Sequence, residues 1–202
     1  VIFLESVSSA ALWGRYGYEA ILAGAQDGVI DGLARDLARN WPLASIVRFD
    51  HEMNVTGGGF PWQGQDPALY RKAFRYVSHR IRQIAPGVLM HWCPQGHTRE
   101  HIESFPLWYP GDDVVDLVGF DRYDLGERRS LDRAWRRPIA ALRAMTHRPI
   151  LVGEFGSQAP GGGRVRWLRS LARVEGLFGA IYFDIDMAAF GGGNDWRMGP
   201  QM

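Results

Sequence analysis

The chain has 202 residues, of which 46% are hydrophobic and 22% charged, so it can bury one sizeable core and is neither disordered nor collagen-like. Its formal net charge is +1 and its arginines are interleaved with acids, which excludes the basic stripe typical of nucleic-acid-binding proteins. The single cysteine excludes an internal disulfide framework, and no apolar run is as long as a membrane span.

Short apolar, β-branched runs alternate along the chain with segments whose apolar residues recur at helical spacing. The predicted strands are 1–5, 45–49, 88–92, 115–120, 149–152 and 179–183. One predicted helix begins at Asp27, a second at the N-cap and first-turn pair Asp66 and Pro67, and two more span 131–145 and 164–174. Strands buried on both faces and separated by helices indicate repeated βα units around a parallel sheet. No linker interrupts the pattern, so we expect one domain.

Polar side chains follow nearly every predicted strand, and this pattern distinguishes two α/β architectures. They are Glu5, 50–54, 92–95, Asp121 with Tyr123, Glu154, and Asp184 with Asp186. A (β/α)8 TIM barrel gathers such side chains around one axis, whereas a doubly wound open sheet does not. The sequence therefore predicts a TIM barrel. Six of its eight strands can be identified, and we expect the other two to precede Val1, as in an N-terminally truncated barrel.

Glu52 and Glu154 each follow a predicted strand and lie three strands apart around the barrel wall. Cleavage of a glycosidic bond needs two carboxyl groups with different pKa values, one to protonate the leaving oxygen and one to attack or activate water. Two glutamates at the mouth of a barrel can provide that pair. Acids at strand ends that simply face solvent are the alternative.

Four segments in this order resemble the catalytic barrel of family 26 glycoside hydrolases, a group dominated by endo-β-1,4-mannanases: VRFDHEMNVTGGGFPW, GDDVVDLVGFDRYD, LVGEFGS, and IYFDID with NDWR. Most related retaining barrels carry Asn directly before the acid/base glutamate, whereas this family carries His, as His51 does here. The resemblance implies that Glu52 is the general acid/base and Glu154 the nucleophile of a retaining hydrolase. It also implies that Tyr123 hydrogen-bonds the nucleophile.

Aromatic side chains are expected in the cleft because sugars offer flat apolar faces to bind. Trp62 and Trp196 match aromatic positions of the family's cleft. Trp92 ends a predicted strand on the same side and could serve either as a sugar platform or in packing. Three other tryptophans, Trp41, Trp135 and Trp167, fall in or beside helices and are predicted to pack there.

Three polar residues beside the predicted acid/base complete the candidate site. The family pattern favours a cleft role for His51, and Arg48 on an inward strand position could balance the local charge. A buried, structurally paired arginine is the alternative for Arg48. Asn54 is expected to line the cleft or to form a turn.

Two alternatives to this enzyme come from the sequence itself. The segment HTREH, residues 97–101, fits the H-x-x-E-H zinc pattern, with Glu103 or Glu127 as a third ligand. A non-catalytic polysaccharide-binding barrel would keep the aromatic residues without turnover. The predicted glycoside hydrolase needs no metal or cofactor.

The expected partner is a polysaccharide, with no nucleic acid and no membrane involved. β-Mannan is the first candidate substrate, and mixed-linkage β-glucan and β-1,3-xylan are the alternatives. No signal peptide is recognised, so secretion is inferred from the substrate class alone.

Overall fold

The computed structural model describes residues 3–7, 17–39, 45–126, 131–159, 162–187 and 196–197. Its strands are β1 (Phe3–Val7), β2 (Ser45–Phe49), β3 (Leu89–Trp92), β4 (Leu117–Val118), β5 (Asp121–Asp124), β6 (Ile150–Ser157) and β7 (Leu177–Tyr182). Its helices include α2 (Asp27–Arg39), α3 (Pro67–Ile84), α4 (Arg99–Glu103), α5 (Phe105–Trp108), α6 (Leu131–Met145) and α7 (Gly163–Leu171). Strands and helices alternate along the chain as the hydrophobic pattern predicts.

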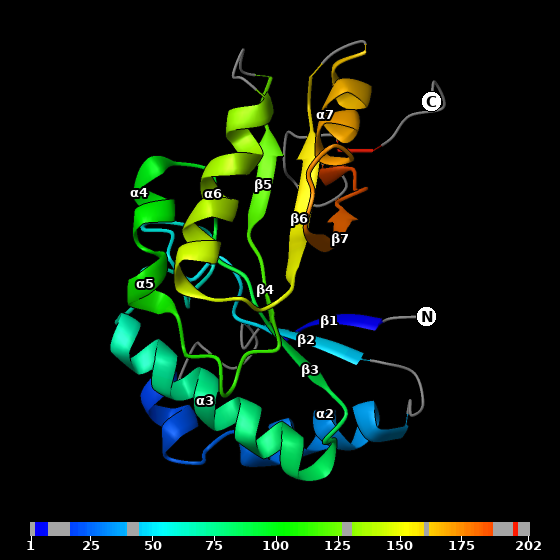
Figure 1. The fold of residues 1–202 in the computed structure, drawn as a ribbon. Helices are drawn as coiled ribbons and strands as arrows, with labels where there is room; N and C mark the ends of the chain where they lie inside the picture. Colours follow the sequence, from blue (N-terminus) through cyan, green and yellow to red (C-terminus); the bar gives the residue numbers. More distant parts are fainter. Residues whose placement is uncertain are drawn as a thin grey trace.

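The strands form one parallel sheet in the order β1-β2-β3-β4-β6-β5, with β7 also paired to β6. The sheet curls, so that β1 to β3 run at a steep angle to β5 and β6, and the helices lie on its outer side (Figure 1). Because β4 and β5 are successive pieces that both pair with β6, the described strands occupy six positions of a barrel wall. The predicted α/β barrel architecture is therefore confirmed.

The predicted strand 115–120 is wrong in detail, because two short strands, β4 and β5, replace it. The break falls at Gly119, where an added Cβ would lie 1.8 Å from the Leu151 carbonyl oxygen and 2.5 Å from His91 Nε2. The His91 ring itself reaches across to that carbonyl oxygen at 3.0 Å. Three strands thus approach so closely at this point that only a glycine fits.

The predicted strand 149–152 is too short, since β6 continues to Ser157. Gly153 and Gly156 interrupt the apolar run that marked the strand in the sequence. Pairing with β5 nevertheless extends β6 by a further four residues, 154–157. Glu154 accordingly lies within β6 rather than after it.

Capping and packing account for the predicted helices. The Asp66 side chain accepts hydrogen bonds from the backbone N–H groups of Ala68 and Leu69, at 2.6 and 3.4 Å, with Pro67 in the first turn of α3. Trp135 of α6 and Trp167 of α7 are buried with ring centroids 4.4 Å apart, which confirms their predicted packing role. Trp41 lies outside the described residues.

None of the helices within the described ranges is long and apolar enough to span a lipid bilayer.

Replacing Gly119 with alanine should destabilise the fold by about 1–3 kcal/mol, because the new methyl group collides with the backbone of β6. Urea unfolding followed by circular dichroism measures the change. Gly32→Ala is the matched control: Gly32 lies inside α2 with open space around its Cα, so alanine should stabilise the helix by about 0.5–1 kcal/mol. Equal midpoints for the Gly119→Ala variant and the unmodified chain would contradict this account of the strand break.

Candidate active site

Glu52 lies in the turn that follows β2, in a backbone conformation that side chains rarely adopt. Both Asp50 and Glu52 have positive φ, at 43° and 55°. Such residues cost of order 1–3 kcal/mol each and persist only where surrounding contacts impose them. Here the Glu52 N–H donates to the Cys93 carbonyl at 2.9 Å, and the Trp62 indole N–H donates to the His51 carbonyl at 2.7 Å. Contacts from neighbouring loops therefore hold this turn in place.

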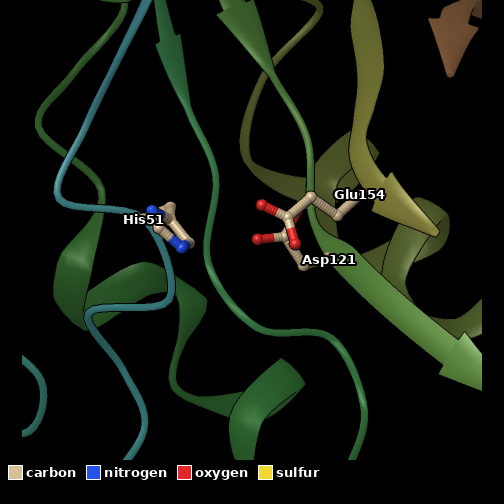
Figure 2. A group of neighbouring side chains, drawn as sticks. All are labelled: His51, Asp121 and Glu154. Carbon is tan, nitrogen blue, oxygen red and sulfur yellow. The ribbon is translucent and has the colours of Figure 1, made fainter. Parts of the chain in front are cut away.

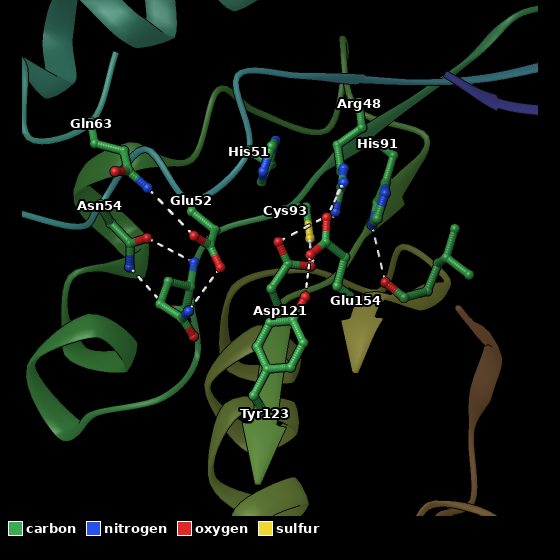
Figure 3. A network of polar contacts seen from close by, with 12 residues as sticks. Arg48, His51, Glu52, Asn54, Gln63, His91, Cys93, Asp121, Tyr123 and Glu154 are labelled. Atoms are coloured by element: carbon green, nitrogen blue, oxygen red, sulfur yellow. Dashed lines mark hydrogen bonds and ion pairs between the residues drawn. The ribbon is translucent and has the colours of Figure 1, made fainter. Parts of the chain in front are cut away.

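Glu154 projects from β6 into a polar cluster at the carboxyl end of the sheet (Figure 3). Arg48 of β2 forms an ion pair with its Oε1, and the Tyr123 hydroxyl of β5 donates a hydrogen bond to its Oε2. The resemblance implied this tyrosine contact, and the structure contains it. Both oxygens of Glu154 thus accept hydrogen bonds that favour the ionised carboxylate.

Asp121 of β5 is the second partner of Arg48. The guanidinium Nη1 lies 3.2 and 3.3 Å from the two Asp121 carboxyl oxygens, and the Cys93 thiol donates to Oδ1 at 3.0 Å. Burial works against the charge on Arg48, yet Asp121, Cys93 and Glu154 together raise its pKa above the ordinary value. Arg48 therefore remains charged and is shared between two carboxyl groups.

Gly153 provides the space for this cluster. An added Cβ would lie 2.4 Å from the Cys93 sulfur, 2.7 Å from Asp121 Oδ1 and 3.0 Å from Arg48 Nη1. Because Gly153 directly precedes Glu154, the backbone of β6 can lie against the cluster while the glutamate points into it.

The environments of Glu52 and Glu154 drive their pKa values apart. Burial, followed by the nearby charge of Glu154, raises the pKa of Glu52 to about 7. Burial also opposes ionisation of Glu154, but Arg48, the Tyr123 hydroxyl and His51 together lower its pKa below the ordinary range. Near neutral pH the pair can therefore hold one protonated and one ionised carboxyl group.

His51 faces Asp121 and Glu154 across the site (Figure 2). One ligand atom from each of the three lies within 4.8 Å of the others, so they could hold a metal ion. Arg48, however, already pairs with both carboxylates, and a cation would have to displace its guanidinium. Burial, followed by the charge of Arg48, lowers the pKa of His51 to about 4, so the imidazole is neutral near neutral pH and charged only in more acidic solution. The arrangement suits proton transfer and sugar binding better than metal binding.

In the HTREH segment, His97 precedes α4 and His101 lies in its last turn. Thr98 caps this helix by accepting from the His101 N–H at 3.2 Å, and Glu103 pairs with Arg99 on the exposed surface at 2.5 Å. Within the described ranges, the one group of three potential metal ligands is that of His51, and neither His97 nor His101 belongs to it. Glu127 lies outside these ranges.

The structure corrects two of the predicted sugar platforms. Trp92 is completely buried, and its ring packs edge-on against Phe105 and Tyr109 on the helix side of the sheet, so it offers no face to a ligand. Trp62 is also completely buried, and Phe60 lies stacked on it with ring centroids 4.6 Å apart. Phe60, which the sequence analysis did not select, is 41% exposed and presents the accessible aromatic face here.

Trp196 lies beside Tyr123. The two ring centroids are 4.6 Å apart, and the indole also borders Gly156 of β6. Its exposed fraction is 6%, so most of its surface contacts protein. Trp196 therefore borders the Glu154 side of the site, close to the tyrosine that hydrogen-bonds this carboxylate.

The sequence model of glycosyl hydrolase family 26 matches residues 16–155, which include Glu52, Tyr123 and Glu154. The chain belongs to glycosyl hydrolase family 26. The resemblance seen in the sequence is thereby confirmed.

Relatives of this family 26 chain carry several different names. Endoglucanase H of Acetivibrio thermocellus is 36% identical over 167 residues, which cover 76% of this chain and 18% of the relative. Beta-1,3-xylanase TXYA of a Vibrio species is 30% identical over 102 residues, covering 48% and 21%. An endo-beta-1,4-mannanase structure from Cellulomonas fimi has a TM-score of 0.66 at 21% identity, covering 81% of this chain and 41% of its own. The chain spans about a fifth of the length of these curated relatives.

Further residues of the family 26 site were not selected from the sequence. Asp121 and Cys93 lie behind Arg48, while Gln95 and Gln63 direct their side-chain N–H groups at Glu52 from 2.8 and 3.4 Å. Asp121 stands two residues before Tyr123 and therefore on the same face of the strand, which was a usable signal. The cysteine and the glutamines carried no comparable signal.

The raised pKa of Glu52 predicts that the contribution of this residue to the stability of the family 26 chain falls as the pH rises. Between the ordinary carboxyl pKa of 4.5 and about 7, the folded state binds more protons at Glu52 than the unfolded state does, so the Glu52 contribution to the free energy of unfolding falls across this interval. Glu52→Gln cannot ionise and should be more stable than the unmodified chain at pH 8, by up to about 3 kcal/mol. The difference should shrink as the pH approaches 4. Urea unfolding at several pH values measures it, and a difference that does not depend on pH would contradict the shift.

Proposed function

We propose that the chain carries the active site of a retaining glycoside hydrolase that cleaves internal β-1,4 bonds of a mannan-type polysaccharide. The observation that carries this proposal is the pair of carboxyl groups with opposite pKa shifts, Glu52 upward and Glu154 downward, at the carboxyl end of a barrel sheet. Membership of family 26 supports it. The polysaccharide would be the partner, and the reaction needs no cofactor.

In the first step Glu154 attacks the anomeric carbon while Glu52 gives its proton to the glycosidic oxygen. The bond between that carbon and that oxygen breaks, and a glycosyl ester forms on Glu154. In the second step Glu52, now ionised, removes a proton from water, which attacks the anomeric carbon. The sugar leaves with its configuration retained, Glu154 is released as a carboxylate, and Glu52 again carries the proton.

The charge on Glu154 couples these two steps. It helps to raise the pKa of Glu52 while the site is empty, so Glu52 begins as an acid. Esterification removes that charge, and the pKa of Glu52 then falls, which suits its role as a base in the second step. Arg48 and Tyr123 act on the other partner by holding Glu154 ionised and fixed for attack.

Sugar binding is proposed for the groups that surround the two carboxyls. His51, neutral and facing Glu154, can hydrogen-bond a sugar hydroxyl. Phe60 offers an exposed ring on one side, and Trp196 with Tyr123 borders the other. A secreted location is proposed from the substrate class, because such polysaccharides lie outside the cell.

A β-glucan is the second candidate substrate. The relative that matches the larger part of this chain, at 36% identity over 76% of its length, is named an endoglucanase. The mannan proposal draws instead on mannanase structures at about a fifth identity. Mannose and glucose differ only in the configuration of one hydroxyl, so the same carboxyl pair can serve either substrate.

Glu52→Ala and Glu154→Ala should each lower polysaccharide turnover by about a hundredfold or more, because each variant removes one half of the carboxyl pair. Reducing-sugar release measures the loss. Azide should restore cleavage of activated aryl glycosides in both variants. It should give the β-glycosyl azide with Glu52→Ala, where it replaces the base in the second step, and the α-glycosyl azide with Glu154→Ala, where it replaces the nucleophile. Near-normal turnover in either variant, or exchanged products, would refute the assignment.

A substrate panel separates the candidate polysaccharides. We expect cleavage of galactomannan and glucomannan to internal oligosaccharides, with kcat/KM at least about tenfold above that for lichenan and β-1,3-xylan. Product chromatography distinguishes internal from terminal cleavage. Preference for lichenan would replace mannan with mixed-linkage glucan and leave the carboxyl assignment intact.

A further inference from the structure

The side-chain amide of Asn54 hydrogen-bonds both the N–H and the carbonyl group of Gln95, as the backbone of a neighbouring strand would. Its Oδ1 accepts from the Gln95 N–H at 2.8 Å, and its Nδ2 donates to the Gln95 carbonyl at 3.1 Å and to the His101 carbonyl at 3.1 Å. Asn54 is 6% exposed. One side chain therefore joins the turn after β2 to the loop after β3, beyond the point where the two strands pair.

The other side of the Gln95 backbone is held by β5. Gln95 forms an isolated parallel bridge with Asp121, and the next N–H, that of Gly96, donates to the Asp121 carbonyl at 3.0 Å. The backbone of Gln95 is thus held on one side by the Asn54 side chain and on the other by the Asp121 backbone. Its own side chain remains free to serve another purpose.

That side chain is directed at Glu52. Gln95 Nε2 donates to Glu52 Oε1 at 2.8 Å. The contact of Gln63 Nε2 with Glu52 Oε2 is longer, at 3.4 Å (Figure 3). Among the described residues the Gln95 Oε1 atom is buried without a hydrogen-bond partner, so the contact with Glu52 is the one that orients this amide. The two oxygens of Glu52 are therefore not equivalent.

We infer that Asn54 and Gln95 are positioning residues that hold the carboxyl group of Glu52 in place for proton transfer. Asn54 fixes the backbone of Gln95, and the Gln95 side chain fixes Glu52 through Oε1. This inference rests on the proposed function, since it requires Glu52 to act as the acid.

The same contact stabilises the transition state more than the ground state. As the proton passes from Glu52 to the glycosidic oxygen and the bond to the anomeric carbon breaks, Glu52 acquires a negative charge. The Gln95 N–H then donates to an ionised rather than a neutral group, and charge-assisted hydrogen bonds are about twice as strong. An interaction that strengthens along the reaction accelerates it.

Gln95→Met keeps the length of the side chain and removes the donor. Its kcat/KM for polysaccharide should fall by about tenfold or more. Its kcat/KM for dinitrophenyl β-mannobioside or β-cellobioside should change by less than about threefold, because this leaving group departs without a proton and kcat/KM reports the first step only. The alkaline limb of the polysaccharide profile should move to higher pH, since a contact that favours ionised Glu52 is lost. Gln65→Met, at an exposed position whose side chain donates a hydrogen bond to the Pro61 carbonyl, is the matched control and should have the activity of the unmodified chain.

An equal loss on both substrates would make Gln95 a merely structural residue, and no loss on either would remove its role; both results overturn the inference. Asn54→Ala should reproduce the selective loss on polysaccharide, and the double variant should be no slower than the slower single variant, because Asn54 acts through Gln95. Losses that multiply in the double variant would refute the connection between the two residues.

The Glu52→Ala variant distinguishes a failure of the positioning role from a failure of the proposed function. If Glu52→Ala loses polysaccharide turnover while Gln95→Met does not, the positioning role fails and the proposed function stands. If Glu52→Ala retains turnover, the proposed function fails, and with it any role for Gln95 in proton transfer.

Discussion

One guanidinium group, that of Arg48, holds together a cluster that would otherwise repel itself. Glu52, Asp121 and Glu154 bring three carboxyl groups to the same end of the sheet, and Arg48 forms ion pairs with two of them. A buried charge is tolerated only when it is paired and hydrogen-bonded, and Arg48 meets this condition through opposite strands of the curl. Because Glu52 lies outside these pairs, it retains its proton to higher pH than Glu154 does. The position of Arg48, together with the Tyr123 hydrogen bond to Glu154, thus separates the two glutamates.

The backbone adjusts to admit this cluster. Gly153 lets β6 lie directly against Arg48, Asp121 and Cys93. Gly119 lets β3 and β6 approach each other closely beside β4. On the opposite side, the positive φ values of Asp50 and Glu52 turn the acid toward the site at a cost in backbone energy. Hydrogen bonds from the adjacent loop, including that of Glu52 N–H to the Cys93 carbonyl, offset this cost. The site is therefore built from close approach and cross-loop contacts more than from the conformational preference of any one segment.

Hydrophobic periodicity predicted α2, α3, α6 and α7 and most of the strands, but not the short helices α4 and α5. Burial on both faces of a parallel sheet leaves a clear apolar run. The periodicity failed where glycines replaced apolar residues, at 119, 153 and 156, since close backbone contact leaves no hydrophobic signal. The prediction that Trp92 lines the cleft was wrong because the strand pattern did not reveal which of two successive residues, His91 or Trp92, points into the barrel. His91 turns toward Arg48 and Leu151, so Trp92 must face the helices. Asp121 was recognised at a strand end, but its pairing with Arg48 was not predicted, because Arg48 is 73 residues away and the curl of the sheet brings the two together.

Cys93 is the single cysteine of the chain, it is completely buried, and its thiol donates to Asp121 in the layer behind Arg48. Burial, together with the charge of Asp121, raises the pKa of this thiol, which keeps it in its unreactive protonated form. A thiol reagent can therefore reach it only when the strands around the site separate. The rate at which a thiol reagent modifies Cys93 therefore reports whether the strands at the catalytic end of the sheet remain packed. A cysteine introduced on the surface could be labelled while Cys93 stays protected.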